Sequence, residues 1–256
     1  AASRKKKLLR LWAFVKFCLF MLALFLIVGV IGGVGVYFYC LPRYELAQSL
    51  DMSKIDDLEV ASKIFDRNGK ELGRIYVQNR HPIPFERVSD NFTNALLAAE
   101  DSRFHTHNGV DPKGLLRVLF QAIKTGEVNQ GASTITQQLA RNAFDMRERS
   151  ISRKVTEAFL AWRIEKEIAD KNKIMELYMN RIYFGDGYYG IASAAEGFFG
   201  GKASDLTIAQ AATLAGVIRN PYYRGPRKFP AESKNTRDGV IRRMLKLDFI
   251  EENQSE

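Results

Sequence analysis

The sequence has few of the residues that build disulfide frameworks and metal sites. Only two cysteines occur among 256 residues, and both, Cys18 and Cys40, lie in an apolar stretch near the N-terminus. Two cysteines in such a place imply neither a disulfide framework nor a cysteine-based metal site. There are three histidines, and none lies at ligand spacing from His107, which makes His107 a poor candidate for a metal ligand.

Acidic residues are missing from the first sixteen positions. These positions hold six basic side chains: Arg4, Lys5, Lys6, Lys7, Arg10 and Lys16. The whole chain has 38 basic and 29 acidic residues, a net charge of +9, but only 32 basic residues remain outside this tail, which leaves +3. The high charge is therefore local and does not indicate nucleic-acid binding.

Charge of either sign is absent from residues 17–41. As a helix this run would be roughly 37 Å long, against about 30 Å for the hydrocarbon core of a bilayer. Trp12, Tyr37 and Tyr39 suit the two membrane interfaces. A cleaved signal peptide is the alternative, but its apolar region would span only about 7–15 residues and end in small side chains. We therefore predict a retained transmembrane helix over residues 17–41, with the basic tail, residues 1–16, in the cytoplasm and the rest outside.

Residues 42–90 are predicted to form a linker and a β-hairpin. Within this region, residues 64–77 carry β-branched side chains on both sides of Asn68 and Gly69. An Asn-Gly pair between such runs favours the tight turn of a hairpin.

The spacing of apolar residues becomes helical after the hairpin. One predicted helix ends at residue 100, the next begins at residue 112, and a third begins at residue 133 or 134. Four more are predicted over residues 150–169, 172–180, 207–217 and 233–247. The helix from Pro112 should stop at Gly126, and its apolar face is formed by Leu115, Leu116, Leu119, Phe120 and Ile123. These elements predict one compact, mainly α domain over residues 91–250, followed by a polar tail over 251–256.

Two helix starts have recognisable caps. Asn91 or Thr93 can cap the helix that ends at residue 100. Ser133 or Thr134 can cap the helix that begins at residue 133 or 134. Gln137 stands three residues after Thr134, which is the spacing of a capping box.

The first segment with the makings of an active site reads EDSRFHTHNG, residues 100–109. Glu100 follows five apolar residues, so it lies where an apolar helix meets a polar loop, and partial burial there suits a general base. His107 could fix this loop by a hydrogen bond, and Gly109 permits a left-handed turn. A solvated Glu-Asp pair at a helix end is the ordinary alternative.

The second segment, residues 130–141, contains a helix start rich in hydroxyl groups. Ser133 and Thr134 place hydroxyl and free N–H groups there, a natural seat for an anion such as pyrophosphate. Gln137 and Arg141 are four residues apart and share one face of the helix. By capping alone, an ordinary capped helix is the better explanation of this segment.

Two further segments carry polar residues at helical spacing. Arg153, Lys154 and Glu157 share one face, where the cations could bind phosphate, although a solvated face with ion pairs is the simpler reading. Residues 171–180, which end at Asn180, have an apolar stripe and are expected to be structural. Arg237 lies in a basic helix that could contact phosphate or membrane.

Taken together and in this order, these segments resemble the five motifs of the peptidoglycan glycosyltransferases, glycosyltransferase family 51. That family occurs as monofunctional transglycosylases and as part of class A penicillin-binding proteins. The resemblance runs from about residue 64 to residue 247, and its first two motifs are specific. The last is loose, because Arg237 is followed by Asp-Gly-Val-Ile where the family has arginine followed by Val-Leu. Gln210 stands where the family commonly has glutamate.

The resemblance implies a mainly α, lysozyme-like fold of two lobes, with the small β-hairpin as an appendage and one N-terminal transmembrane helix. It implies an enzyme of peptidoglycan biosynthesis that polymerises lipid II into β-1,4 glycan strands and releases undecaprenyl pyrophosphate. Its partners would be lipid II, the growing glycan strand, the bacterial cytoplasmic membrane and other cell-wall synthesis proteins, but no nucleic acid. The catalytic domain would lie on the outer side of the membrane.

The resemblance also assigns roles to residues. Glu100 would be the general base, and Glu157 would assist by positioning Lys154 or through a divalent cation, Mg or Mn. The chemistry itself requires no cofactor. The residues expected to contact substrate are Asp101, Phe104, His107, Ser133, Thr134, Gln137, Arg141, Arg153, Lys154, Asn180 and Arg237.

Three rival interpretations remain open at this point. A lytic muramidase on the same fold would need one catalytic glutamate and little phosphate-binding charge, whereas this chain has several candidate cations. A non-catalytic scaffold of cell-wall assembly would tolerate loss of Glu100 or Glu157, and both are present. The chain could also be the glycosyltransferase part of a longer, bifunctional penicillin-binding protein.

Overall fold

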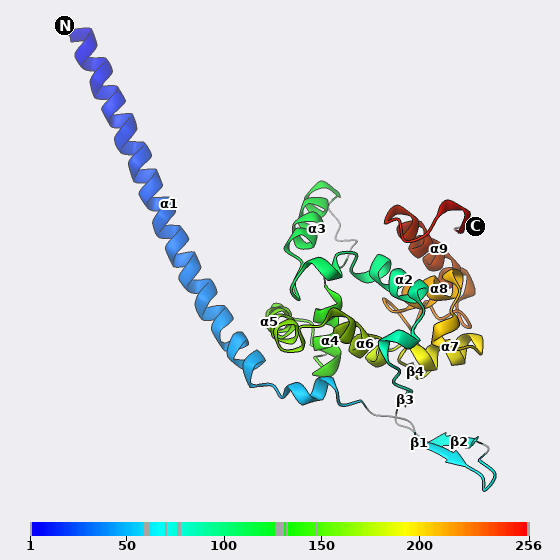
Figure 1. Cartoon of the computed structure of the whole chain (residues 1–256). Helices are drawn as coiled ribbons and strands as arrows, with labels where there is room; N and C mark the ends of the chain where they lie inside the picture. Colours follow the sequence, from blue (N-terminus) through cyan, green and yellow to red (C-terminus); the bar gives the residue numbers. More distant parts are fainter. Residues whose placement is uncertain are drawn as a thin grey trace. The chain divides into compact units, whose positions relative to one another are not determined.

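The computed structural model describes residues 2–58, 62–69, 71–75, 78–125, 131, 133–146 and 148–254 (Figure 1). The chain falls into two compact units, residues 1–46 and 47–256. Gly126, predicted to stop a helix, lies outside the described residues, as do the end of the predicted hairpin at 76–77 and the last two residues of the polar tail.

The first unit consists of helix α1, Ala2–Ser49, whose last residues enter the second unit. From Trp12 onward α1 is long and apolar enough to cross a membrane, and none of the side chains in its most apolar window is buried within the chain. The helix does not end at residue 41 but continues through Pro42. Proline lacks the N–H that would complete the helical ladder, yet one such residue can remain inside a long helix at the cost of a hydrogen bond.

The second unit begins with short elements. The 3₁₀ helix η1, Met52–Ile55, is followed by strands β1, Ser62–Phe65, and β2, Glu71–Ile75, which pair antiparallel. Gly69 adopts a φ of +80° in the turn between them. The predicted hairpin and its Asn-Gly turn are thereby confirmed.

The rest of the described second unit contains eight α-helices, a pair of two-residue strands and four short 3₁₀ helices. The helices are α2 Asp90–Glu100, α3 Pro112–Thr125, α4 Ile135–Ala143, α5 Ile151–Ile168, α6 Lys171–Arg181, α7 Ile191–Phe199, α8 Ile208–Val217 and α9 Pro230–Lys246. Strands β3, Asn79–Arg80, and β4, Tyr188–Tyr189, pair in parallel. Four more 3₁₀ helices are η2 Phe85–Arg87, η3 Phe104–Thr106, η4 Ala203–Asp205 and η5 Glu252–Gln254. The predicted fold class, mainly α with a small hairpin and one apolar N-terminal helix, is confirmed.

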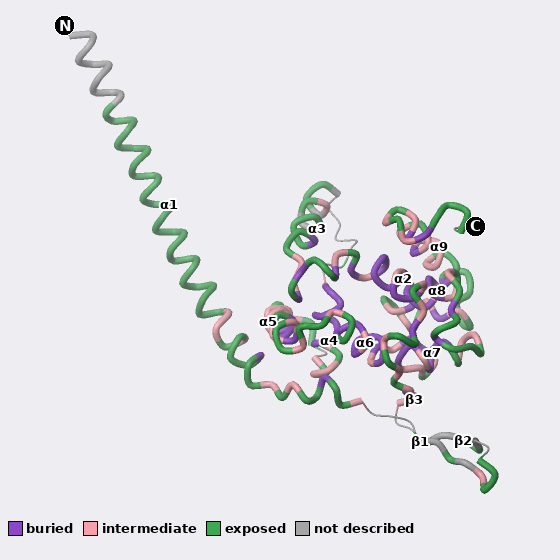
Figure 2. Tube along the Cα trace, in the orientation of Figure 1, coloured by how far each residue is buried: buried purple, intermediate pink, exposed green. Residues whose placement is uncertain are grey.

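The core forms where α2 packs against α8 and α9, and where α4 packs against α5 and α6. Figure 2 shows the buried residues concentrated along these helices. Alanines at positions 211, 212 and 215 of α8 are fully buried. A Cβ added at Gly216 would lie 2.7 Å from the Thr236 side chain, so α8 and α9 approach more closely there than any larger residue allows.

Two expectations about helix starts were wrong, and one helix was not predicted. The N-cap of α2 is Ser89, whose Oγ accepts from the Phe92 backbone N–H at 3.3 Å, whereas the Asn91 amide donates to the Leu206 carbonyl at 2.9 Å. Helix α9 begins at Pro230, three residues before the predicted start, because proline is well suited to a first turn. Helix α7 was not predicted. Its Ala- and Gly-containing sequence has no polar N-cap, and tertiary packing therefore decides its conformation.

Two arginines fasten the start of the second unit. One guanidinium nitrogen of Arg163, on α5, donates to the carbonyls of Ala47, Gln48 and Leu50 at 2.8–2.9 Å. Arg181 likewise donates to three carbonyls in residues 54–57 at 2.7–2.9 Å. Carbonyls at a helix end lack partners within the helix, so these arginines replace the missing donors.

We expect Arg163→Ala to loosen residues 47–58 while leaving the helical core intact. Losing these hydrogen bonds should remove about 1 kcal/mol of local stability and speed proteolytic cleavage in this segment about fivefold. Limited proteolysis of the whole chain in detergent measures this rate. Lys166→Ala, an exposed position on the same helix, is the control, and equal cleavage rates for both variants would contradict the assigned role of Arg163.

Candidate active site

Glu100 is the last residue of α2, and its side chain is held from two sides. Only 8% of the side chain is exposed. One carboxylate oxygen, Oε2, accepts from the Gln138 amide at 2.9 Å, and the other, Oε1, accepts from Arg219 Nε at 3.1 Å. Arg219 also donates to the Ala99 carbonyl at 2.8 Å, which fixes its guanidinium against the end of α2. The carboxylate is therefore oriented before any ligand arrives.

A fully buried tyrosine orients Gln138 in turn. The Tyr178 hydroxyl donates to Gln138 Oε1 at 2.9 Å. Burial, with a smaller contribution from the negative charge of Glu100, raises the pKa of Tyr178 well above its usual range. The phenol therefore stays protonated and acts as a donor, so the Gln138 carbonyl must face Tyr178 and its NH₂ group must face Glu100.

Asp101, Phe104 and His107 are all buried and shape the loop after α2. Asp101 Oδ2 accepts from the backbone N–H of Ile135, the first residue of α4, at 3.1 Å, and lies 3.0 Å from His107 Nε2. His107 thus fixes the loop as predicted, through Asp101. Gly109 has a φ of +86°, and an added Cβ there would lie 2.6 Å from the Ala161 backbone, which confirms the predicted left-handed turn.

The start of α4 has the predicted capping box. Thr134 Oγ1 accepts from the Gln137 backbone N–H at 3.1 Å, and Gln137 Oε1 accepts from the Thr134 N–H at 3.2 Å. The Thr134 hydroxyl donates to the Gly109 carbonyl at 2.6 Å. Ser133 Oγ accepts from Lys154 Nζ at 2.5 Å, so the helix start is linked to the cations of α5.

Glu157 is completely buried between two cations of its own helix. Its oxygens lie 3.0 Å from an Arg153 guanidinium nitrogen and 3.0 Å from Lys154 Nζ, as expected for residues on one face. Lys154 remains 40% exposed. A ligand would therefore meet Lys154 rather than Glu157. Among the described residues, no group of three or more His, Cys, Asp and Glu could hold a metal ion, and the two cations beside Glu157 make it a poor metal ligand.

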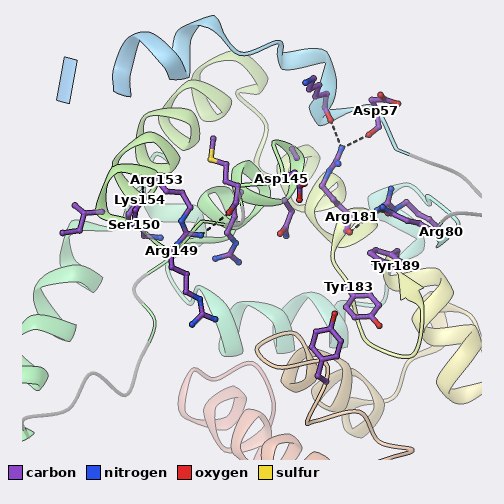
Figure 3. A pocket seen from close by; sticks show the side chains of 18 residues that line it. Asp57, Arg80, Asp145, Arg149, Ser150, Arg153, Lys154, Arg181, Tyr183 and Tyr189 are labelled. Carbon is purple, nitrogen blue, oxygen red and sulfur yellow. Dashed lines mark hydrogen bonds between the residues drawn. The ribbon is translucent and has the colours of Figure 1, made fainter. Parts of the chain in front are cut away.

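A large cavity of about 1280 Å³ lies beside α4 and α5 (Figure 3). Among the described residues, its charged lining is strongly basic, with seven cations, Lys54, Arg80, Arg141, Arg149, Arg153, Lys154 and Arg181, against two acids, Asp57 and Asp145. Sequence reasoning had selected three of these cations. It missed the others because they come from separate segments that only the tertiary fold brings together.

A smaller cavity of about 210 Å³ borders Glu100. Four cations line it: Arg117, Arg219, Arg243 and Lys246. Burial lowers the pKa of Arg243, and the nearby Arg219 charge adds to this, while Glu100 acts in the opposite direction. The predicted Arg237 lines neither cavity and pairs with Asp238 at 2.7 Å.

Both polar atoms of the Asn180 side chain form hydrogen bonds with the backbone. Its Oδ1 accepts from the Ile83 N–H at 3.0 Å, and its Nδ2 donates to the Ile83 carbonyl at 2.8 Å. The structure thus brings Glu100 together with Gln138 and Arg219, which were not selected, and brings Ser133, Lys154, Arg153 and Glu157 together as a second group. Substrate contact by any of these residues stays a prediction.

Comparisons with known proteins identify the family. The family model described as Transglycosylase matches residues 68–245. Penicillin-binding protein 1A of Pseudomonas aeruginosa is 38% identical over 220 residues, which are 86% of this chain and 26% of that protein. Penicillin-binding protein 1A of Aquifex aeolicus is 36% identical over 236 residues, 90% of this chain and 32% of that protein. The crystal structure of penicillin-binding protein 1A from Haemophilus influenzae matches with a TM-score of 0.43 and 21% identity, over 78% of this chain and 20% of that one.

The matched region contains every motif described above. The chain spans about a quarter to a third of the length of these curated relatives. The family model nevertheless covers well over half of this chain, from the hairpin turn to α9. The chain belongs to the transglycosylase family, and the resemblance to the peptidoglycan glycosyltransferases is confirmed.

Proposed function

We propose that this chain is a membrane-anchored peptidoglycan glycosyltransferase, which polymerises lipid II into β-1,4 glycan strands and releases undecaprenyl pyrophosphate. The observation that carries the proposal is the arrangement around α4. Gln138 of this helix binds the carboxylate of Glu100, while Arg141, three residues later, lines the large basic cavity. One helix thus contacts both the candidate base and the candidate anion site.

Glu100 is the general base of this reaction. Its carboxylate is held in place by Arg219 and Gln138. It accepts the proton of the 4-hydroxyl of the acceptor N-acetylglucosamine as that oxygen attacks C1 of the donor N-acetylmuramic acid. Attack opposite the leaving group converts the α-linkage of the donor into a β-linkage.

The cations of the large cavity stabilise the leaving group. The pyrophosphate gains negative charge as its bond to C1 breaks, and fixed cations in place before the reaction lower the energy of that state. Arg141, Arg149 and Lys154 are suited to this task because all three line the cavity. A muramidase, whose leaving group is a sugar hydroxyl, would have no use for seven cations.

Glu157 acts on the substrate only through its neighbours. With no exposed surface, it holds Lys154 and Arg153 in place by ion pairs of 3.0 Å. The family resemblance implies two roles for Glu157. These contacts favour the positioning of Lys154 over the binding of a divalent cation.

The proposed substrates explain two apolar surfaces of the chain. Helix α1 would anchor the enzyme, with the basic tail in the cytoplasm and the catalytic unit on the outer side. Helix α3 exposes four large apolar side chains, Leu115, Leu116, Phe120 and Ile123, which are 54–75% exposed. A water-soluble enzyme rarely leaves such a face open, whereas lipid tails or the bilayer surface would cover it.

We expect Glu100→Gln to abolish polymerisation of labelled lipid II by the whole chain reconstituted in membranes. The amide cannot accept the proton, and loss of a general base costs about 10²–10⁴-fold in rate. Gel separation of the glycan products measures this loss, and Glu176→Gln, a glutamate that binds the Phe85 backbone N–H, is the control. Well-folded parent protein that makes no polymer would sink the synthetic function. Digestion of preformed glycan would then favour a muramidase, and inertness a scaffold.

Tyr178→Phe tests the chain of hydrogen bonds that runs from Tyr178 through Gln138 to Glu100. Removing the hydroxyl leaves Gln138 free to turn its amide, so Glu100 loses a fixed partner. We expect kcat to fall about fivefold with little change in KM, the effect of losing about 1 kcal/mol of orientation. Steady-state rates on lipid II measure both constants, and Tyr223→Phe, an exposed tyrosine, is the control. A Tyr178→Phe variant with the parent's kcat would remove Tyr178 from the mechanism.

A further inference from the structure

Three tyrosines stand together in the lining of the large cavity. Tyr183 follows α6, Tyr189 belongs to β4, and Tyr222 lies in the segment between α8 and α9. The ring centroid of Tyr183 lies 4.7 Å from that of Tyr189 and 6.0 Å from that of Tyr222. We name these three residues the tyrosine ledge. They form one continuous aromatic surface from three separate segments.

The tyrosine ledge lies apart from three of the cavity's cations, Arg149, Arg153 and Lys154, whereas the guanidinium of Arg80 lies 5.5 Å from the ring centroid of Tyr189. Figure 3 shows Arg149, Arg153 and Lys154 on one side of the cavity and Tyr183 and Tyr189 on the other. The cavity therefore offers two kinds of surface to one ligand. One side suits an anion, and the other presents aromatic rings, with Arg80 beside Tyr189.

A second cavity begins at the same tyrosines. It measures about 420 Å³, and Tyr183 and Tyr222 line both cavities, so the two spaces meet at this pair. The lining of the second cavity includes Pro221 and Phe229, and the charged residues among its described lining, Asp186 and Lys228, pair at 2.9 Å. This space has no excess charge, in contrast to the first.

We propose that the tyrosine ledge is a binding site for sugar rings of the growing glycan strand, and that it leads the strand from the basic cavity into the second cavity. This inference rests on the proposed function and names how that site holds its polymer. The apolar faces of sugar rings stack on aromatic side chains, whose hydroxyl groups can also exchange hydrogen bonds with sugar. A neutral cavity with a few polar groups fits the same ligand.

The need for such a ledge follows from the chemistry. A pyrophosphate site holds a single disaccharide as well as it holds a long strand, because both carry the same leaving group. Contacts with sugars further along the strand are available only to a strand. They slow its release between additions and so lengthen the product.

The sharpest test compares neighbouring tyrosines. Tyr222 is 73% exposed and lines both cavities, whereas Tyr223 is 64% exposed, packs its ring 5.9 Å from that of Phe229 and lines neither. Both side chains are exposed enough for alanine variants to fold. Tyr222→Phe keeps the ring and removes only the hydroxyl.

We expect the Tyr222→Ala variant of the whole chain to make shorter strands from lipid II. The median strand length should fall about threefold, because one aromatic contact changes affinity about twofold to tenfold. The rate of joining the first two lipid II molecules should match that of the parent, since that step needs no sugars beyond the donor. Tyr223→Ala should give strands of parental length, and Tyr222→Phe, which keeps the ring, should give longer strands than Tyr222→Ala.

Failure of the ledge is distinguishable from failure of the proposed function. Strands of parental length from Tyr222→Ala would overturn the ledge and leave the glycosyltransferase standing. If the parent makes no polymer, the proposed function fails, and titration with a lipid-free GlcNAc–MurNAc oligosaccharide judges the ledge by itself. Saturable binding that weakens about twofold to tenfold in Tyr222→Ala, but not in Tyr223→Ala, supports the ledge. No binding by the parent overturns it.

Discussion

The carboxylate of Asp101 joins the two halves of the active site. It accepts from the backbone N–H of Ile135 at the start of α4 and lies against His107 in the loop that follows α2. A buried carboxylate at a helix N-terminus is stabilised by the free N–H groups and by the helix dipole. Because α2 carries Glu100 and α4 carries Gln138, this one contact sets the distance between the candidate base and the residue that orients it.

The acidic side chains of the site form ion pairs with basic side chains. Each candidate catalytic carboxylate has a cationic partner, Arg219 for Glu100 and both Arg153 and Lys154 for Glu157. A buried carboxylate without such partners would lose its hydration at a cost of several kcal/mol. The two pairs of Glu157 also relieve repulsion between Arg153 and Lys154, which both line the large cavity.

Three surfaces of the chain match three chemical parts of the proposed substrate, lipid II. The cations of the large cavity suit pyrophosphate, the exposed face of α3 suits lipid, and the tyrosines suit sugar. Each surface is built from a different kind of side chain and draws on a different segment. A polymerase that works at a membrane needs all three at once, because its substrate is an anion, a lipid and a carbohydrate in one molecule.

Sequence by itself determined the local features of this protein. The uncharged run of α1, the Asn-Gly turn, the capping box at Thr134 and the left-handed Gly109 follow from nearest neighbours, and all were predictable. The choice of Glu100 as candidate base also came from the sequence, through the order of the family's motifs, and it stays a prediction. Tertiary structure alone decided its partners. Gln138 and Arg219 lie 38 and 119 positions away from Glu100, and neither carries a local signal for that contact. The tyrosine ledge and most of the basic cavity have the same origin, since packing brings side chains of distant segments together and no sequence pattern records which ones will meet.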